Sequence, residues 1–209
     1  MFLPSVQPSS PRWFFFPGPL GRGFLCPLVS LLIVCGCLVG CASPQLNDYR
    51  EKQPTFAPEA FFDGFLTAHG LVKDYSGEVI RTFNADINAC WRGGLGTLDE
   101  QFVFDDGEQQ SRLWTLKPSG EQRYTATAGD VVGQGQASWA GNAFFLNYTL
   151  RIDTGDGDTL DVDIDDRMYR ISDTVVVNES RIFKWGLPVG QILLTIVRHP
   201  DQPATCPLD

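Results

Sequence analysis

The chain contains the stretch Leu146-Asn147-Tyr148-Thr149-Leu150-Arg151-Ile152-Asp153, in which apolar side chains occupy the even positions and polar side chains the odd ones. This period of two is typical of a strand with one buried face. Leu160-Asp161-Val162-Asp163-Ile164-Asp165 repeats the pattern, and turn-forming residues at 154–159 separate the two stretches. We therefore predict a β-hairpin over residues 146–165.

The same pattern of strands and turns extends over most of the chain. Turn residues recur about every ten positions, as in an antiparallel meander. No window has a convincing helical period, although 58–66 can open with a short turn of helix. Closing the strands into a ring removes exposed edges. We predict an all-β fold, a lipocalin-like up-and-down barrel of about 8–10 strands, with a β-sandwich as the alternative. The other predicted strands are 60–72, 77–90, 95–104, 110–117, 121–128, 131–139, 168–172, 174–184 and 189–198.

The interior of such a barrel is just wide enough for side chains or one small ligand. On one predicted strand Glu100 shares a face with Phe102 and Phe104, and on the next Arg112 shares a face with Trp114. If both faces point inward, Glu100 and Arg112 can pair inside the barrel, because burying either charge alone is costly. Alternatively, both side chains lie near a rim, in water.

Three polar residues, Asn178, Ser180 and Lys184, lie on the same face of the predicted strand 174–184. These residues either add hydrogen-bonding groups to the cavity or form the outer face of the barrel. The candidate cavity-lining residues are therefore Glu100, Phe102, Phe104, Arg112, Trp114, Asp166, Asn178 and Lys184, with Ser180 on the same face as the last two.

Catalytic motifs are scarce. Asp165 and Asp166 are predicted to end a strand, where paired carboxylates can share a proton and act as acid and base. A solvated strand end is the alternative. His69 and His199 lie in no recognisable motif, and there is no nucleophile elbow. The acidic hairpin tip lacks the spacing of a calcium loop. The sequence predicts no metal or cofactor and leans away from an enzyme.

The N-terminal region predicts a targeting segment. Phe24–Val39 is almost wholly apolar, follows two arginines, and is shorter than the ~20 residues that span a bilayer as a helix. Leu38-Val39-Gly40-Cys41 resembles a bacterial lipobox, in which the chain is cut before the cysteine and the cysteine is acylated. An uncleaved anchor or an ordinary signal peptide is the alternative.

Acyl chains on Cys41 would hold the protein at a membrane, since each buried CH₂ contributes about 0.8 kcal/mol. Ala42, rather than Asp, follows Cys41, which favours the periplasmic face of the outer membrane. The expected organisation is a lipoprotein signal peptide at 1–40, a lipidated N-terminus and flexible tether at 41–58, a β-barrel domain at 59–200 and a C-terminal tail at 201–209.

The net charge bears on possible partners, and the cysteines bear on a possible disulfide or metal site. The formal net charge is −9 and the basic residues are scattered, which argues against binding of nucleic acid. Cys90 and Cys206 are the cysteines that remain after Cys41. In an oxidising envelope they predict a disulfide, although two unpaired thiols are the alternative. No His or Cys lies at zinc-binding spacing.

Several stretches together resemble a bacterial lipoprotein family catalogued as domain of unknown function 3833, over roughly 45–198. The most specific are Asp165-Asp166-Arg167-Met168-Tyr169 and Lys184-Trp185-Gly186-Leu187-Pro188-Val189-Gly190, and Phe61-Phe62-Asp63-Gly64 is a further matching stretch. The resemblance implies an envelope lipoprotein with a barrel and no assigned reaction. Genes of this family often lie near those of fatty-acid-modifying enzymes, which points to lipid biology.

Three functions follow from these features. The first is a lipid-anchored barrel that binds a fatty acid or other apolar ligand, because aromatic walls with a few polar groups are typical of such pockets. The second is a structural or partner-binding lipoprotein with a filled core, with its protein partners left open. The third is a lipid-modifying enzyme that uses the Asp165–Asp166 pair.

Overall fold

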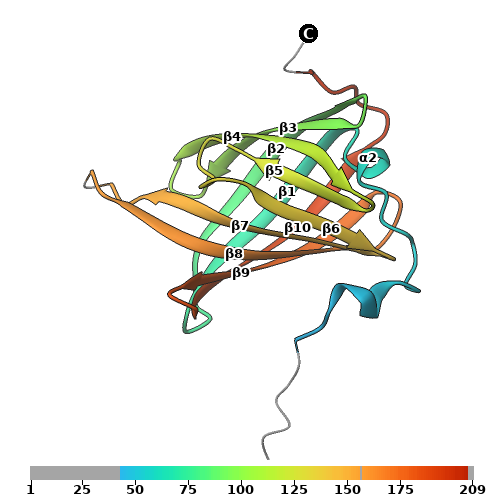
Figure 1. Ribbon diagram of the computed structural model, residues 1–209. Helices are drawn as coiled ribbons and strands as arrows, with labels where there is room; N and C mark the ends of the chain where they lie inside the picture. Colours follow the sequence, from blue (N-terminus) through green and yellow to red (C-terminus); the bar gives the residue numbers. More distant parts are fainter. Residues whose placement is uncertain (1–42, 156, 207–209) are drawn as a thin grey trace, which may run out of the picture. The chain divides into compact units, whose positions relative to one another are not determined.

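Ten antiparallel strands close into one barrel within the part of the chain that the structure describes (Figure 1). This computed structural model describes residues 43–155 and 157–206. Each strand pairs with its neighbours in sequence, and the first pairs with the last to close the ring. The predicted all-β up-and-down barrel is therefore confirmed. The strands are β1 (Gly64–Asp74), β2 (Val79–Arg92), β3 (Leu95–Phe104), β4 (Gln109–Gly120), β5 (Arg123–Thr127), β6 (Gly135–Ala140), β7 (Ala143–Asp153), β8 (Thr159–Arg170), β9 (Val175–Lys184) and β10 (Leu187–His199).

The predicted hairpin is confirmed, and its second strand is longer than expected. β8 pairs with β7 along the whole length of β7. The predicted separate strands 160–165 and 168–172 form one continuous strand, because no turn residue interrupts the alternation between them. The prediction that Asp165 and Asp166 end a strand is therefore wrong. They lie within β8 and, as neighbours on a strand, point to opposite faces of the sheet.

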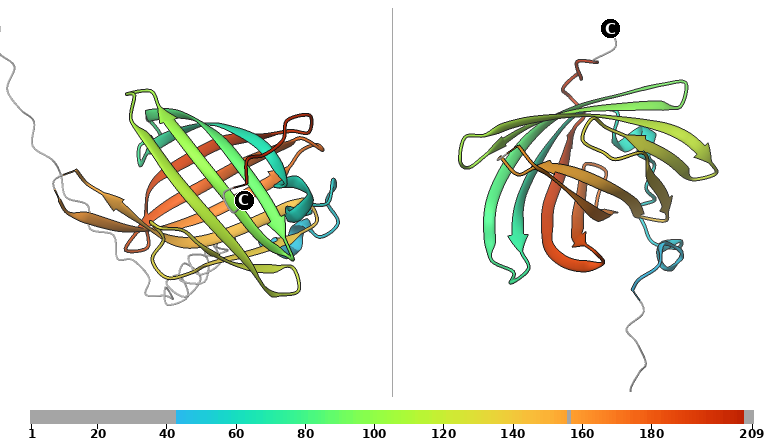
Figure 2. Two further views of the ribbon diagram at one scale, coloured as in Figure 1. Left: turned by 90° about the horizontal axis from the view of Figure 1, so that it is seen from above. Right: turned by 60° about the vertical axis from the view of Figure 1, so that its left-hand side comes forward.

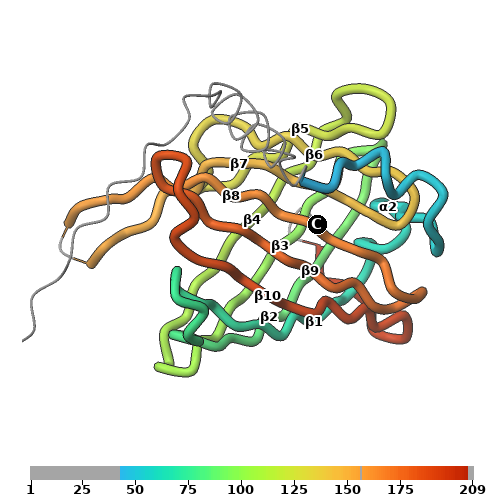
Figure 3. Tube along the Cα trace, turned by 90° about the horizontal axis from the view of Figure 1, so that it is seen from below, coloured from blue at the N-terminus to red at the C-terminus, as the bar shows by residue number. Residues whose placement is uncertain are grey.

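The barrel has two different ends (Figures 2 and 3). The turns β1–β2, β3–β4, β7–β8 and β9–β10 gather at one end, which we call the mouth, together with the β5–β6 connection at 128–134. The short helix α2 (Pro58–Phe61) lies at the opposite end, which we call the closed end. There the indole N–H of Trp91, near the end of β2, donates to the carbonyl of Phe62 at 3.2 Å.

A cluster of phenylalanine rings fills the closed end. Phe56, Phe61, Phe62 and Phe144 are each at most 4% exposed. Neighbouring rings in this cluster lie with their centroids 5.2–6.1 Å apart, in tilted or edge-to-face arrangements. Because full burial of one such side chain contributes about 1.5–3 kcal/mol, this cluster is a major part of the hydrophobic core.

The chain before β1 packs against the outside of the barrel before it reaches the closed end. A single turn of 3-10 helix, η1 (Leu46–Tyr49), precedes this crossing. The ring of Tyr49 lies 5.8 Å from that of Phe145 and 5.3 Å from that of Tyr169. Farther along, the N–H of Phe56 donates to the carbonyl of Gly141 at 2.6 Å.

These contacts correct the predicted tether at 41–58. From Pro44 onward it belongs to the barrel body, because its aromatic side chains are packed rather than solvated. Cys41 and the predicted signal peptide at 1–40 lie outside the described residues. Among the helices that the structure does describe, none has the length and apolar character needed to cross a membrane.

The C-terminal tail is joined to the barrel covalently. Cys90 on β2 and Cys206 form a disulfide across a sequence separation of 116. The N–H of Thr205 also donates to the Asn88 side chain at 2.9 Å. Of the two cysteine states considered above, the structure contains the bridge rather than two free thiols.

Candidate functional site

The barrel interior contains a cavity of about 130 Å³. It lies between the phenylalanine cluster of the closed end and the mouth, and its walls come from all of the longer strands. Apolar side chains form most of the wall, since alternate positions of every strand point inward. Six of the predicted cavity-lining residues border it, namely Glu100, Phe102, Arg112, Trp114, Asp166 and Asn178, and Ser180 and Tyr148 border it as well.

Phe104 and Lys184 do not border the cavity, although both occupy strand positions whose side chains alternate toward the inside of the barrel. Phe104 lies at the mouth, where the guanidinium of Arg81 stacks 3.6 Å from its ring centroid. The ammonium of Lys184 donates to the backbone carbonyl of Asp161. Both residues are the last of their strands, so the barrel wall ends before their side chains can reach the interior.

The predicted pairing of Glu100 with Arg112 is loose, because Arg112 has a better partner. The two residues face each other across β3 and β4, with Nη1 of Arg112 3.9 Å from Oε2 of Glu100. Asp130, from the β5–β6 connection, instead accepts hydrogen bonds from Arg112 on both carboxylate oxygens, at 3.1 Å from Nε to Oδ1 and at 2.7 Å from Nη2 to Oδ2. This bidentate pair leaves Glu100 without full charge compensation.

The environment of Glu100 therefore favours its neutral form. Burial raises the pKa of the Glu100 carboxyl to about 7, although Arg112 acts to lower it. Its side chain is 15% exposed, and that of Arg112 is 18% exposed. Both residues border the cavity, so they lie inside the barrel rather than at a rim in water.

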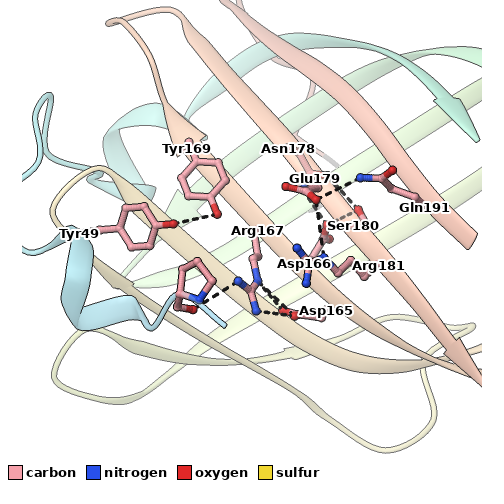
Figure 4. Close-up of polar contacts among 11 residues, drawn as sticks. Tyr49, Asp165, Asp166, Arg167, Tyr169, Asn178, Glu179, Ser180, Arg181 and Gln191 are labelled. Carbon is pink, nitrogen blue, oxygen red and sulfur yellow. Dashed lines mark hydrogen bonds and ion pairs between the residues drawn. The ribbon is translucent and has the colours of Figure 1, made fainter. Parts of the chain in front are cut away.

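A second polar group forms a closed network on the opposite wall (Figure 4). Asp166 on β8 accepts a hydrogen bond of 2.7 Å from the amide of Asn178 on β9, and its same oxygen contacts the hydroxyl of Ser180. The Ser180 hydroxyl also lies 2.9 Å from the Asn178 side-chain oxygen. All three side chains are at most 8% exposed.

If Asp166 were ionised, the three side chains would have one proton too few to form all of these hydrogen bonds. The Ser180 hydroxyl has a single proton but faces two oxygen acceptors, one on Asp166 and one on Asn178. Turning the Asn178 amide over does not help, because its oxygen then faces the Asp166 oxygen. A protonated Asp166 satisfies every contact: it donates to Ser180, which donates to Asn178.

Electrostatics agree with the neutral form. Burial raises the pKa of the Asp166 carboxyl, although the hydrogen bonds from Ser180 and Asn178 act to lower it. A buried carboxylate without a paired cation is costly. The raised pKa and the hydrogen-bond partners of Asp166 both favour its neutral form at the cavity wall.

The suggested carboxylate pair of Asp165 and Asp166 does not exist as a site. Asp165 points to the outside of β8, where the guanidinium of Arg167 donates to it at 2.8 Å (Figure 4). Asp166 points to the inside. Because the sheet separates the two groups, they cannot share a proton. The described residues also contain no group of three metal-ligating side chains.

Sequence reasoning missed Asp130 and Tyr148. Tyr148 has the inward parity of its strand and packs edge-to-face on Trp114 at 5.1 Å, so the alternation alone would have found it. Asp130 lies in a glycine-rich connection without strand periodicity. Only the closure of the barrel brings it to Arg112, so no local signal could have found it.

Comparison with known proteins gives a family. Residues 35–198 match the family model described as protein of unknown function (DUF3833). The chain belongs to this family. The resemblance drawn from the sequence motifs is thereby confirmed. No curated protein matches the chain.

A solved structure supports the fold of this DUF3833 protein. The S-type phycobiliprotein lyase CPES from Guillardia theta aligns with a TM-score of 0.50 and 14% sequence identity, over 76% of this chain and 100% of that one. At this identity the likeness shows the fold alone. Function must therefore be argued from the cavity.

Proposed function

We propose that this protein is a lipoprotein, anchored through Cys41 at the periplasmic face of the outer membrane, whose barrel binds a small apolar ligand. The observation that carries the ligand-binding part is the cavity, which has apolar walls and a few polar groups aimed into it. That combination is typical of ligand pockets, where polar groups fix the orientation of an otherwise apolar guest. The lipobox-like segment supports the anchor.

The size of the cavity limits the part of a ligand that can enter. Its volume of about 130 Å³ is close to that of an engineered protein cavity of ~150 Å³ that binds benzene. The barrel therefore accepts one ring or a short acyl segment. A longer ligand would extend through the mouth, because the phenylalanine cluster closes the other end.

The charges in the cavity favour a neutral polar group on the ligand. Arg112, the cation that borders the cavity, is already paired with Asp130. An ionised fatty acid would have to displace Asp130 and would lie near Glu100. A hydroxyl, an amide, an ester or a protonated acid can instead hydrogen-bond to Glu100 or Asp166 without introducing an anion.

The structural alternative has one observation in its favour. The closed half of the barrel is filled by its own side chains, as expected of a protein whose barrel serves only as a scaffold. The cavity distinguishes the two functions, because a scaffold has no need of buried carboxyls beside empty space.

Native mass spectrometry tests the proposal on the full chain, produced in a bacterial envelope and extracted in detergent. We expect a non-covalent ligand mass that disappears on denaturation. The denatured mass should show the loss of residues 1–40 and the addition of acyl chains. A ligand-free protein would favour the scaffold, and an unmodified N-terminus would overturn the anchor.

Two neighbouring residues on β10 provide a matched pair of variants. Leu194 borders the cavity, whereas Leu193 has the opposite parity and does not. We expect Leu194→Trp to fill the cavity and abolish the ligand mass. Leu193→Trp should retain it. Equal retention by both variants would show that the ligand binds elsewhere.

A further inference from the structure

Large apolar side chains are exposed on one side of the mouth. They lie at the tips of the hairpins β1–β2 and β9–β10, where Tyr75 is 85% exposed and Trp185 is 88% exposed. A contiguous exposed apolar patch, unlike a single exposed apolar residue, marks an interaction site on a soluble protein. We call this group the mouth patch. Its members are Tyr75, Val79, Ile80, Trp185, Leu187 and Val189.

The two tips are neighbours in the closed barrel. β1 pairs with β10 up to the pairing of Asp74 with Gly190, so both hairpins project beyond the same point of the wall. Trp185 lies at the apex of its turn with φ +52°, followed by Gly186 with φ +76°. A bulky residue seldom adopts positive φ. The indole is exposed there, with the ammonium nitrogen of Lys184 5.3 Å from its ring centroid.

The rest of the mouth is acidic. The β3–β4 turn contains Asp105, Asp106 and Glu108, and the β7–β8 turn contains Asp153 and Asp158. The β1–β2 turn adds Asp74 and Glu78 beside the mouth patch, so acidic groups surround the apolar tips. These carboxylates would be repelled by anionic headgroups, so the mouth patch can meet a membrane best where the lipid is zwitterionic.

We propose that the mouth patch inserts into the interface of a lipid bilayer, so that the cavity opens toward the membrane. Trp and Tyr prefer this interface because their rings are apolar at one end and polar at the other. This docking rests on the proposed function for the anchor, and it adds a route by which an apolar ligand enters without crossing water.

The position of the anchor agrees with a barrel held close to the bilayer. The carbonyl of Pro44 accepts a hydrogen bond of 3.3 Å from Arg167, which fixes the chain to the outer wall of β8. Cys41 lies three positions earlier, a chain length of at most ~10 Å. An acylated Cys41 would therefore hold the outer wall of β8 near the lipid, and the mouth patch would add a second contact with it.

Fluorescence quenching by brominated lipid tests the docking. The full chain is reconstituted in phosphatidylcholine vesicles with bromine on the acyl chains, and tryptophan emission is compared with that in unbrominated vesicles. In the chain that begins at Cys41, which lacks Trp13, the tryptophans Trp91, Trp114 and Trp139 belong to the barrel core, whereas Trp185 is exposed. We expect quenching in the wild type and its loss in Trp185→Phe. Equal quenching in both would overturn the proposal.

Substitutions elsewhere in the mouth patch test the same contact without removing the reporter. Replacing Tyr75 and Leu187 together by Ser should weaken quenching of Trp185, with about tenfold weaker partitioning for each apolar side chain removed. Ile171→Ser is the matched control, since Ile171 is 56% exposed but lies at the β8–β9 turn of the closed end. It should leave quenching unchanged. Added phosphatidylglycerol should reduce quenching.

The outcomes separate docking from ligand binding. A ligand mass in native spectra without quenching would overturn the docking and leave the cavity function intact. Quenching without a ligand mass would support the docking and overturn the ligand-binding function of the cavity. If the Tyr75 and Leu187 substitutions change the oligomeric state in detergent and quenching is absent, the patch is a contact between protein chains and the membrane proposal fails.

Discussion

The closed end and the mouth half of the barrel are built from the same alternating strands but are filled differently. At the closed end Phe61 and Phe144 are each 2% exposed and contact other rings on several sides. Towards the mouth, the same inward positions hold Glu100, Arg112 and Asp166 around empty space. Packing stabilises the first region, whereas the second bears the cost of buried polar groups. This division suggests that stability resides at one end and binding at the other.

The largest effect is expected from the disulfide that ties the C-terminal tail to the closed end. Its sequence separation of 116 corresponds to about 4–5 kcal/mol in the chain-entropy model. We expect the double variant Cys90→Ser with Cys206→Ser to lower the free energy of unfolding by about that amount, measured by urea denaturation. Reduction of the wild type should reproduce the loss. A loss well below 1 kcal/mol would show that the tail contributes little.

A pair of phenylalanines compares the two ends directly. Phe61→Ala at the closed end should destabilise by about 3–5 kcal/mol, because it leaves a cavity among packed rings. Phe104→Ala at the mouth should cost less, since Phe104 is only partly buried. Urea denaturation of both variants gives the comparison. Equal costs would contradict the division between a packed end and an open end.

The buried carboxyl of Glu100 predicts an unusual dependence of stability on pH. Its pKa is about 7 when folded and 4.5 as an isolated group, so the folded protein binds more protons between these values. The free energy of unfolding should therefore fall as pH rises through this window, by on the order of 3 kcal/mol. Glu100→Gln should remove the part of this fall that Glu100 contributes, leave the part that comes from the raised pKa of Asp166, and be more stable than wild type at about pH 8.

Urea denaturation at about pH 5 and about pH 8 measures this difference. Glu78→Gln, at the exposed β1–β2 turn, is the control and should keep the pH dependence of the wild type. An unchanged dependence in Glu100→Gln would show that Glu100 is ionised in the folded protein.

The Asp166 network provides a smaller effect. If Asp166 is neutral, Asp166→Asn replaces one uncharged hydrogen-bonding group by another and should cost less than about 1 kcal/mol. Asp166→Ala leaves the buried groups of Asn178 and Ser180 without their partner and should cost about 1–3 kcal/mol. Thermal denaturation near neutral pH measures both. Equal losses for Asn and Ala would contradict the neutral carboxyl.

The smallest effect on stability is expected at the mouth patch. Trp185→Phe should change the free energy of unfolding by less than about 0.5 kcal/mol, because an exposed turn side chain has few packing partners. The same variant is expected to abolish quenching by brominated lipid. A large loss of stability would show that Trp185 packs against the barrel and would weaken the interpretation of the patch as a free surface.

The sequence by itself determined where the strands lie and which side chains share a face of each strand. Alternation is a local property, since neighbouring residues on a strand point to opposite faces wherever that strand lies. The hairpin over 146–165 and the common face of Arg112 and Trp114 could therefore be predicted, whereas the inward direction of that face was left open by the sequence. The motifs around Asp165–Tyr169 also identified the family.

The tertiary structure alone decided how the inward groups are paired. Arg112 is bound by Asp130 from a connection without periodicity, and Phe61 closes one end from a helix that precedes the barrel. Burial inside the closed ring raises the pKa of the Asp166 carboxyl, while Asn178 and Ser180 on the next strand hydrogen-bond to it. These pairings depend on the closure of the ring and on burial, which are properties of the assembled barrel and not of any single strand.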